Sequence, residues 1–255
     1  MIIQIYEIQT PAEAAAVIRL GVNHIGSVIV SREEWKTPTV RETIAETRRL
    51  GAVSTLIPLF SGKDEICQAI DYFQPDILHL CENITEKTKY PLMNLQEKIK
   101  TRYPDIKVMR SIPIERDGNA DMDSVIELAR RFEPFSDYFL TDTRLSVRED
   151  DGDKRQPVEG FVGITGQTCS WRVAAELVNQ SGIPVILAGG ISPENAFEGI
   201  KAVKPAGIDS CTRTNAVDQN GNPVRFKKDL QRVELLVQEA RKGEKALLSG
   251  KIKDN

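Results

Sequence analysis

Cysteine and histidine are scarce in this chain of 255 residues, which contains four cysteines and two histidines. The cysteines lie far apart and form no Cys-x-x-Cys pair, which argues against a zinc site and against a disulfide framework. No apolar run approaches the ~20 residues that cross a bilayer. The N-terminus also lacks the basic segment, apolar core and cleavage site of a secretion signal. We therefore expect a cytoplasmic protein with no membrane partner.

Neither sign of charge is in large excess. The chain has 34 Lys and Arg residues against 37 Asp and Glu residues, so its formal net charge is −3. No cluster of basic residues offers a footprint for nucleic-acid phosphates, which argues against a nucleic-acid partner. Hydrophobic residues make up 40% of the chain and charged residues 28%. That composition is typical of a globular protein and not of a disordered or fibrous one.

The apolar pattern alternates between a strand period and a helix period eight times along the chain. The predicted strands are residues 2–8, 24–30, 53–60, 76–81, 106–112, 138–142, 183–188 and 207–211. The predicted helices are residues 10–20, 38–50, 63–73, 91–102, 121–132, 170–180, 193–203 and 226–241. The first helix has typical boundary residues, because Thr10 can cap it, Pro11 opens it and Gly21 follows its end.

Eight strand–helix alternations in a chain of this length predict a (β/α)8 barrel, also called a TIM barrel, in the α/β class. A doubly wound open sheet is the alternative, but no Gly-x-Gly-x-x-Gly motif follows the first strand. We expect a single barrel domain over residues 1–241. The charged loop after the sixth strand, at 145–162, is either solvated or a lid. Residues 242–255 are expected to form a lysine-rich C-terminal tail with a frayed end.

The ends of the seventh and eighth strands carry the residues best suited to bind an anion. Gly189-Gly190 lets backbone N–H groups approach a ligand closely, and Ser192-Pro193 then begins a helix. The eighth strand ends in residues 209–214 (DSCTRT), which add hydroxyl groups, further N–H groups and the Arg213 cation. A tight turn would explain the glycine pair alone. Its place after strand seven, where barrels commonly bind phosphate, favours a phosphate site at Gly189, Gly190, Cys211 and Thr212.

Four segments resemble the phosphoribosylanthranilate isomerase family. Residues 184–195 (PVILAGGISPEN) look like its seventh-strand signature, and residues 208–212 (IDSCT) are similar to its aspartate-then-serine segment, which helps to bind the substrate phosphate. Residues 163–171 (GITGQTCSW) resemble its glycine-rich lead into the sixth helix, and residues 140–143 (LTDT) match the end of its sixth strand. The resemblance covers most of the chain and is strongest over residues 138–212.

This resemblance implies a barrel of the ribulose-phosphate-binding type and an aldose–ketose isomerase of tryptophan biosynthesis. The family performs an Amadori rearrangement of a phosphoribosyl amine, without a metal or a cofactor. The resemblance implies that Asp142 is the general acid and that Gly166 lies at the substrate. A carboxyl group at a barrel-strand end can have its pKa raised by desolvation, which favours the acid role for Asp142 over the alternative of a helix cap or a loop hydrogen bond. The implied partner is a small phosphorylated sugar, bound by a monomer or a homodimer.

The sequence departs from the family at the general base. The family has a cysteine followed by a glycine at the end of strand one, and here Tyr6 and Glu7 occupy those positions. With reference pKa values of ~8.5 and ~10, an unperturbed tyrosine is roughly thirty times less ionised than a cysteine. Tyr6 and Glu7 are both candidate bases. Adjacent residues of a regular strand point to opposite faces, so we expect only one of them to face the lumen.

A second departure follows the second strand, where the family has an arginine that binds the anthranilate carboxylate. Glu34 occupies that position, so Arg32 is the nearest substitute, with Arg110 and Arg144 as alternatives at other strand ends. These departures keep two further hypotheses open: a diverged paralogue that acts on another sugar phosphate, and a protein that only binds one. His79, in the fourth strand, is expected to be a hydrogen-bonded barrel histidine.

Overall fold

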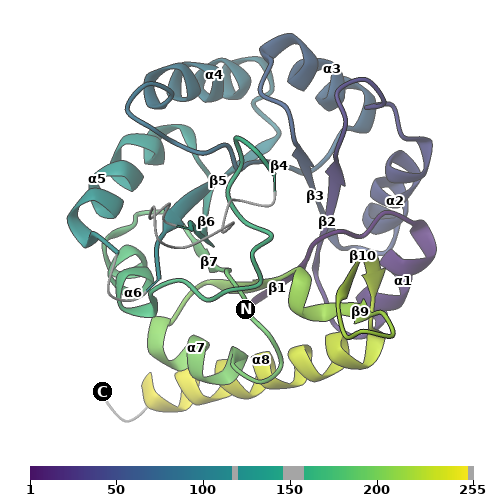
Figure 1. Ribbon diagram of the computed structural model, residues 1–255, viewed down its shortest axis with the longest axis vertical. Coiled ribbons are helices and arrows are strands. Elements are labelled where there is room, and N and C mark those ends of the chain that lie inside the picture. Colours follow the sequence, from purple (N-terminus) through teal and green to yellow (C-terminus); the bar gives the residue numbers. More distant parts are fainter. Residues whose placement is uncertain (117–119, 146–157, 252–255) are drawn as a thin grey trace.

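The computed structural model describes residues 1–116, 120–145 and 158–251 and consists of a closed barrel of eight parallel strands inside a ring of helices (Figure 1). The barrel closes because β1 pairs with both β2 and β8. The strands are β1 (Ile2–Ile5), β2 (His24–Ile29), β3 (Val53–Pro58), β4 (Ile77–Leu80), β5 (Lys107–Ile114), β6 (Tyr138–Thr143), β7 (Val185–Leu187) and β8 (Gly207–Ser210). The predicted (β/α)8 architecture is confirmed.

A helix follows each strand and packs on the outside of the barrel (Figure 1). The helices are α1 (Pro11–Arg19), α2 (Pro38–Arg49), α3 (Lys63–Phe73), α4 (Lys89–Arg102), α5 (Met122–Phe132), α6 (Trp171–Gln180), α7 (Ala196–Val203) and α8 (Leu230–Lys251). Two short 3-10 turns, η1 (Glu133–Phe135) and η2 (Thr212–Thr214), follow α5 and β8. Among the residues described, no helix is both long and apolar enough to cross a membrane.

The start of α1 shows how local sequence sets these boundaries. The Thr10 hydroxyl accepts a hydrogen bond from the backbone N–H of Glu13, and Pro11 is the first helical residue. The cap satisfies a donor that the first turn leaves free, and proline loses nothing there because its position needs no N–H. Gly21 follows with φ +103°, a conformation that favours glycine. The predicted cap is confirmed.

The strands are buried on both faces, and so the protein has two apolar layers. The larger layer lies between the strands and the helices. The smaller one fills the barrel lumen, with Tyr6, Val28, Ile77, Met109, Leu140, Ile186 and Ala188. Strand residues that alternate between these two layers explain the near-continuous apolar runs of the sequence.

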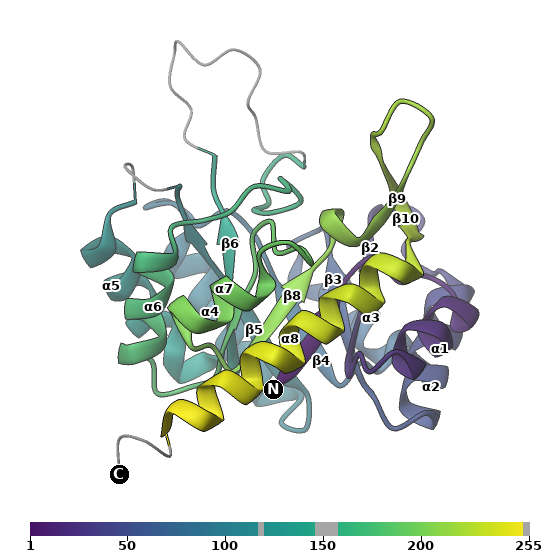
Figure 2. The same cartoon turned by 90° about the horizontal axis from the view of Figure 1, so that it is seen from below.

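The structure differs from the predicted pattern around the last helix. Residues 226–229 were expected to begin it, but a two-stranded hairpin of β9 (Asn215–Val217) and β10 (Pro223–Lys228) occupies this region and rises from the barrel (Figure 2). The helix then continues to Lys251, ten residues beyond the expected boundary at 241. Of the predicted loop at 145–162, residues 146–157 lie outside the described part of the chain.

Arg110, proposed above as a possible ligand for a carboxylate, points instead into the layer between strands and helices. Its Nη1 donates to Glu82 Oε2 at 2.7 Å and its Nε donates to Gln96 Oε1 at 3.0 Å. The guanidinium also lies 5.1 Å from the centre of the Phe132 ring. Glu82 pairs through its backbone with Phe161, so this buried ion pair also holds the segment that returns from the loop after β6.

We expect Arg110→Met to lower the free energy of unfolding by about 3–5 kcal/mol, because it leaves the Glu82 carboxylate buried without its cation. Adding Glu82→Gln to this variant should recover part of the loss. The matched control is Arg49→Met, since Arg49 pairs with Glu46 while 68% of its side chain is exposed. That change should cost less than about 1 kcal/mol. Urea unfolding measures all three, and equal losses for Arg110→Met and Arg49→Met would contradict the expectation.

Candidate active site

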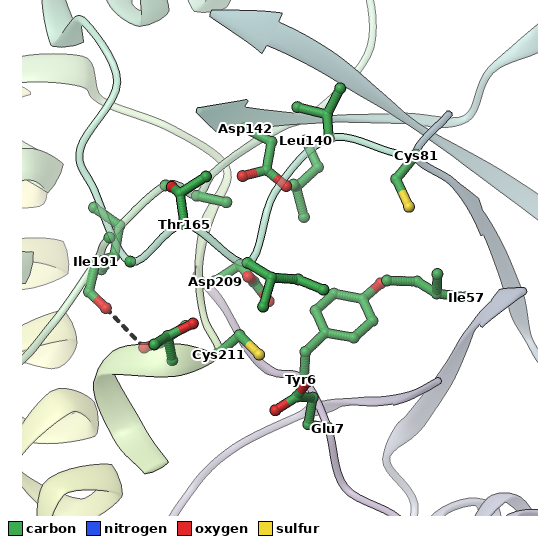
Figure 3. A pocket seen from close by; sticks show the side chains of 18 of the residues that line it. Tyr6, Glu7, Ile57, Cys81, Leu140, Asp142, Thr165, Ile191, Asp209 and Cys211 are labelled. Atoms are coloured by element: carbon green, nitrogen blue, oxygen red, sulfur yellow. Dashed lines mark hydrogen bonds between the residues drawn. The ribbon is translucent and has the colours of Figure 1, made fainter. Parts of the chain in front are cut away.

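A pocket opens at the carboxyl ends of the strands, where the loops of a barrel build their binding sites (Figure 3). Seven of the eight site residues predicted from the sequence line it: Tyr6, Asp142, Gly166, Gly189, Gly190, Cys211 and Thr212. Segments more than 200 residues apart in the chain therefore meet at one place. The eighth residue, Arg32, is not part of the lining.

Asp142 lies near the end of β6 and is half-buried. Desolvation raises the pKa of its carboxyl group to about 7, against the opposing effect of the Thr143 N–H, which donates to Oδ1 at 2.8 Å. The backbone of Gly163 lies directly against this carboxyl group. A Cβ atom at Gly163 would come within 2.2 Å of Asp142 Oδ2. Asp142 therefore holds a proton near neutrality, which is the property that a general acid needs.

Asp209, in β8, is a second carboxyl group in the same pocket, whereas the sequence places it only within the segment that resembles a phosphate-binding one. It is 6% exposed, and Gln4 Nε2 donates to its Oδ1 at 3.1 Å. Desolvation raises its pKa to about 8, and the nearby Asp142 adds to the rise. The signal in the sequence is an acidic residue within a short strand whose end is expected at the site.

Tyr6 points into the lumen, and its hydroxyl lies 2.6 Å from His79 Nδ1. The other ring nitrogen of His79 lies 2.8 Å from Ser111 Oγ. Desolvation raises the pKa of Tyr6 well above its usual value, with Asp209 contributing, and desolvation lowers the pKa of His79 to about 3. Both groups are therefore neutral. The predicted hydrogen-bonded role of His79 is confirmed.

Space for the Tyr6 ring comes from Gly26 in β2. A Cβ atom at Gly26 would come within 2.2 Å of the ring. Because the ring lies against bare backbone, the strand can hold a side chain much bulkier than cysteine without opening the barrel.

Glu7 also lines the pocket, so the expectation that only one of Tyr6 and Glu7 faces it is wrong. The reason is that β1 ends at Ile5 and Glu7 has φ +62°, which breaks the alternation of a regular strand. Glu7 is 1% exposed and pairs with Arg225 of β10 at 2.6 Å. Asn215 Nδ2 also donates to it, at 3.3 Å.

The predicted phosphate-binding residues form one wall of the pocket. Gly189 and Gly190 have φ values of +86° and +59°, and a Cβ atom at Gly190 would lie 2.6 Å from the backbone of Gln167. Arg213 Nε donates to the carbonyl oxygen of Gly166 at 2.8 Å, which joins the loop after β8 to the loop after β6. Gly189, Gly190, Thr212 and Arg213 all line the pocket, so this wall offers backbone, a hydroxyl group and a guanidinium, which are the groups that a phosphate site uses.

The other candidate cations lie away from this pocket. Arg32 is exposed on the loop after β2 and pairs with Glu65, and Glu34 beside it is exposed. Arg144 pairs with Glu115 at 3.0 Å. Arg213 is the one cationic side chain in the lining formed by the described residues. In that part of the chain, no group of three His, Cys, Asp or Glu side chains is placed to hold a metal ion.

Comparison with known proteins adds sequence evidence to this geometry. A model of the N-(5′-phosphoribosyl)anthranilate isomerase family matches residues 94–239, more than half of the chain. The chain belongs to this family.

Relatives named N-(5′-phosphoribosyl)anthranilate isomerase align with nearly the whole chain. The isomerase of Methanocella arvoryzae is 27% identical over 234 residues, which cover 91% of this chain and 94% of that protein. The isomerase of Methanothrix thermoacetophila is 27% identical over 229 residues, 87% and 92% of the two chains. The crystal structure of the isomerase from Thermotoga maritima shares the fold, with a TM-score of 0.69 at 18% identity over 94% of this chain and 99% of that one.

Asp142→Asn should stabilise the folded protein at about pH 8. The carboxyl pKa is about 7 in the folded chain against 3.8 ordinarily, so the folded state binds this proton more tightly. Stability therefore falls as pH rises from ~4 to ~7 and remains lower above that range. Asparagine cannot ionise, so the free energy of unfolding should rise by roughly 1–3 kcal/mol near pH 8 and change little near pH 4.

The control for this prediction is Asp137→Asn. Although desolvation acts on Asp137 as well, its pKa is lowered, because Lys100 and the Val108 N–H bond to the carboxylate. That substitution should destabilise the protein near pH 8. Urea unfolding at the two pH values measures both variants, and equal stability of Asp142→Asn and the parent near pH 8 would show that the Asp142 carboxyl is well solvated.

Proposed function

We propose that this protein is an aldose–ketose isomerase that rearranges N-(5′-phosphoribosyl)anthranilate, a step of tryptophan biosynthesis. Membership of the family supports the reaction class. The observation that carries the proposal is that a carboxyl group protonated near neutrality, Asp142, shares one pocket with the glycine-rich wall at Gly189 and Gly190. A ligand held by its phosphate at that wall would place its sugar ring in the pocket, next to Asp142.

In this reaction the phosphate anchors the substrate, and Asp142 gives its proton to the ring oxygen. The C1′–oxygen bond then breaks, and the nitrogen lone pair forms the Schiff base. The anchored phosphate would hold the sugar ring beside the positioned acid. A related isomerase has been solved with reduced 1-(O-carboxyphenylamino)-1-deoxyribulose 5-phosphate bound, at 17% identity and a TM-score of 0.66. That compound suits binding experiments on this chain.

A second candidate is the same rearrangement of a phosphoribosyl amine that carries no carboxylate. One observation favours it: among the described residues, Arg213 is the one cation in the pocket lining, and it stands with the phosphate-binding wall. Competition of the reduced product analogue with and without its ring carboxylate separates the two candidates. Tighter binding of the carboxylate form supports the anthranilate substrate, and tighter binding of the other form supports the second candidate.

We expect the chain to consume N-(5′-phosphoribosyl)anthranilate, and Asp142→Asn to reduce kcat by about 10²–10⁴-fold, the usual contribution of a positioned acid. Loss of the substrate's anthranilate-type fluorescence follows the reaction. The control is Asp105→Asn, since Asp105 is exposed and lies just before β5, at the opposite end of the barrel. A folded parent chain with no turnover, or an Asp142→Asn variant with full activity, would refute the proposal.

Gly163→Ala should reduce turnover much more than Gly160→Ala. Both glycines have positive φ, +109° and +81°, so both substitutions strain the backbone by about 1–3 kcal/mol. Only at Gly163 would the new methyl group meet the Asp142 carboxyl; at Gly160 no atom lies within 4 Å. The expected difference is about tenfold or more in kcat at similar thermal stability. Equal rates in the two variants would show that the position of Asp142 does not limit the reaction.

A further inference from the structure

The rearrangement needs a base as well as an acid, because a proton must leave C2′ after the sugar ring opens. Besides Asp142, six groups that line the pocket could take a proton: Tyr6, Glu7, His79, Cys81, Asp209 and Cys211. The hydrogen bonds and charges around each of them decide which one is free to act.

Tyr6 and His79 belong to a hydrogen-bonded chain that ends at Ser111. The two hydroxyl groups and the neutral imidazole carry three donor hydrogens but make only two hydrogen bonds with one another. One hydrogen is therefore left over, on either Tyr6 or Ser111. Ser111 is fully buried with no second partner among the described residues, whereas Tyr6 borders the pocket. The spare hydrogen is therefore better placed on Tyr6. This arrangement makes Ser111 a donor to His79 and His79 a donor to Tyr6, so the Tyr6 hydroxyl can donate to a ligand. Tyr6 stays a neutral phenol, because burial raises its pKa, and a neutral phenol oxygen is a weak base.

Glu7 and the two thiols are also unsuitable. The Glu7 carboxylate is held by Arg225 and Asn215 of the β9–β10 hairpin. Burial raises the pKa of the Cys81 and Cys211 thiols, and the neighbouring carboxylates add to that rise, so the thiolate forms that could accept a proton are rare.

Asp209 remains, and its geometry suits proton transfer. Its Oδ1 accepts a hydrogen bond from Gln4, while its Oδ2 has no hydrogen bond within the described residues. It projects into the same pocket as Asp142, from β8 on the side of the barrel next to β1 (Figure 3). The charged or titratable groups that act on it are Asp142 and, more weakly, Lys228; Tyr6 and Cys211 also lie close enough to feel its charge.

We propose that Asp209 is the second proton-transfer residue of the reaction and takes the proton from C2′, the role that the missing cysteine would have filled. This inference rests on the proposed isomerase function. Both carboxyl groups have raised pKa values because of desolvation and, for Asp209, because of the other's charge. Two such groups in one pocket titrate as a coupled pair that holds one proton over a range of pH. The proton favours Asp209, whose pKa is the higher, and the form that starts the reaction has the proton on Asp142 and an ionised Asp209.

The proton balance closes with these two residues. Asp142 gives its proton to the ring oxygen as the C1′–oxygen bond breaks and the C1′–nitrogen double bond forms. Asp209 takes the C2′ proton, the C–H electron pair forms the C1′–C2′ double bond, and the nitrogen recovers its lone pair. Asp209 then returns a proton to C1′, while the Asp142 carboxylate takes the proton of the 2′-hydroxyl as the ketone forms. Both groups end in their starting protonation states.

The test compares Asp209→Asn with Tyr6→Phe and Asp142→Asn, using N-(5′-phosphoribosyl)anthranilate with hydrogen or deuterium at C2′. Asp209→Asn should lower kcat by about 10²–10⁴-fold and raise the deuterium isotope effect, because C–H cleavage becomes slower than the other steps. Asp142→Asn should lower kcat and suppress the isotope effect, because ring opening becomes limiting. Tyr6→Phe should stay within about tenfold of the parent, as expected for the loss of one hydrogen-bond donor.

Binding of the reduced product analogue serves as the structural control and should change less than about threefold in Asp209→Asn, because amide and carboxylate have the same shape. If Asp209→Asn does not fold, Asp209→Ser takes its place with the same expected outcome. Full activity in a folded Asp209 variant would overturn the assignment while leaving the isomerase function standing. A large loss with a raised isotope effect in Tyr6→Phe would transfer the role to Tyr6. A parent chain without turnover would overturn both the function and the assignment.

Discussion

The buried ion pair between Arg110 and Glu82 connects the outer layer of the barrel to residues 161–164, the segment that borders the pocket. Arg110 is fully buried between β5 and the helices, and its position determines where Glu82 lies after β4. The backbone of Glu82 bridges to Phe161, and the segment that follows brings Gly163 against the Asp142 carboxyl. The environment that raises the pKa of Asp142 therefore depends on a charge pair on the opposite face of the sheet. An unpaired charge at this position would be costly, so the position of residues 161–164 depends on the packing around Arg110.

The lumen below the pocket is filled differently from what the family resemblance implies. Tyr6 occupies the place of a smaller residue, and its ring is accommodated by the bare backbone of Gly26. Its hydroxyl group is then satisfied by His79 and, through it, by Ser111. A buried polar chain of this kind is stable because every heavy atom in it has a partner. Burial keeps Tyr6 and His79 neutral, which leaves the proton chemistry to the carboxyl groups.

The β9–β10 hairpin is attached to the barrel at two residues that line the pocket, Glu7 and Cys211. Glu7 takes a left-handed conformation at the end of the first strand, and Arg225 of the hairpin neutralises its buried carboxylate. Lys228 of the same hairpin donates to the Cys211 carbonyl oxygen at 3.0 Å. The ion pair between Glu7 and Arg225 thus attaches the β9–β10 hairpin to the barrel. Backbone strain of about 1–3 kcal/mol at Glu7 is offset by this pairing.

The eight strand–helix repeats, the barrel and the turn at Gly189 and Gly190 can be predicted from the sequence, because apolar periodicity and the placement of glycine and proline are local signals. The sequence also indicates which end of the barrel carries the site, since loops that follow the strands all meet there. Three features became visible only in the folded chain: Glu7 leaves the strand, Arg110 faces the helices, and Asp209 lies in the same pocket as Asp142. Those outcomes depend on contacts between residues as distant in sequence as Glu7 and Arg225, where burial and charge, and not local propensity, select the conformation.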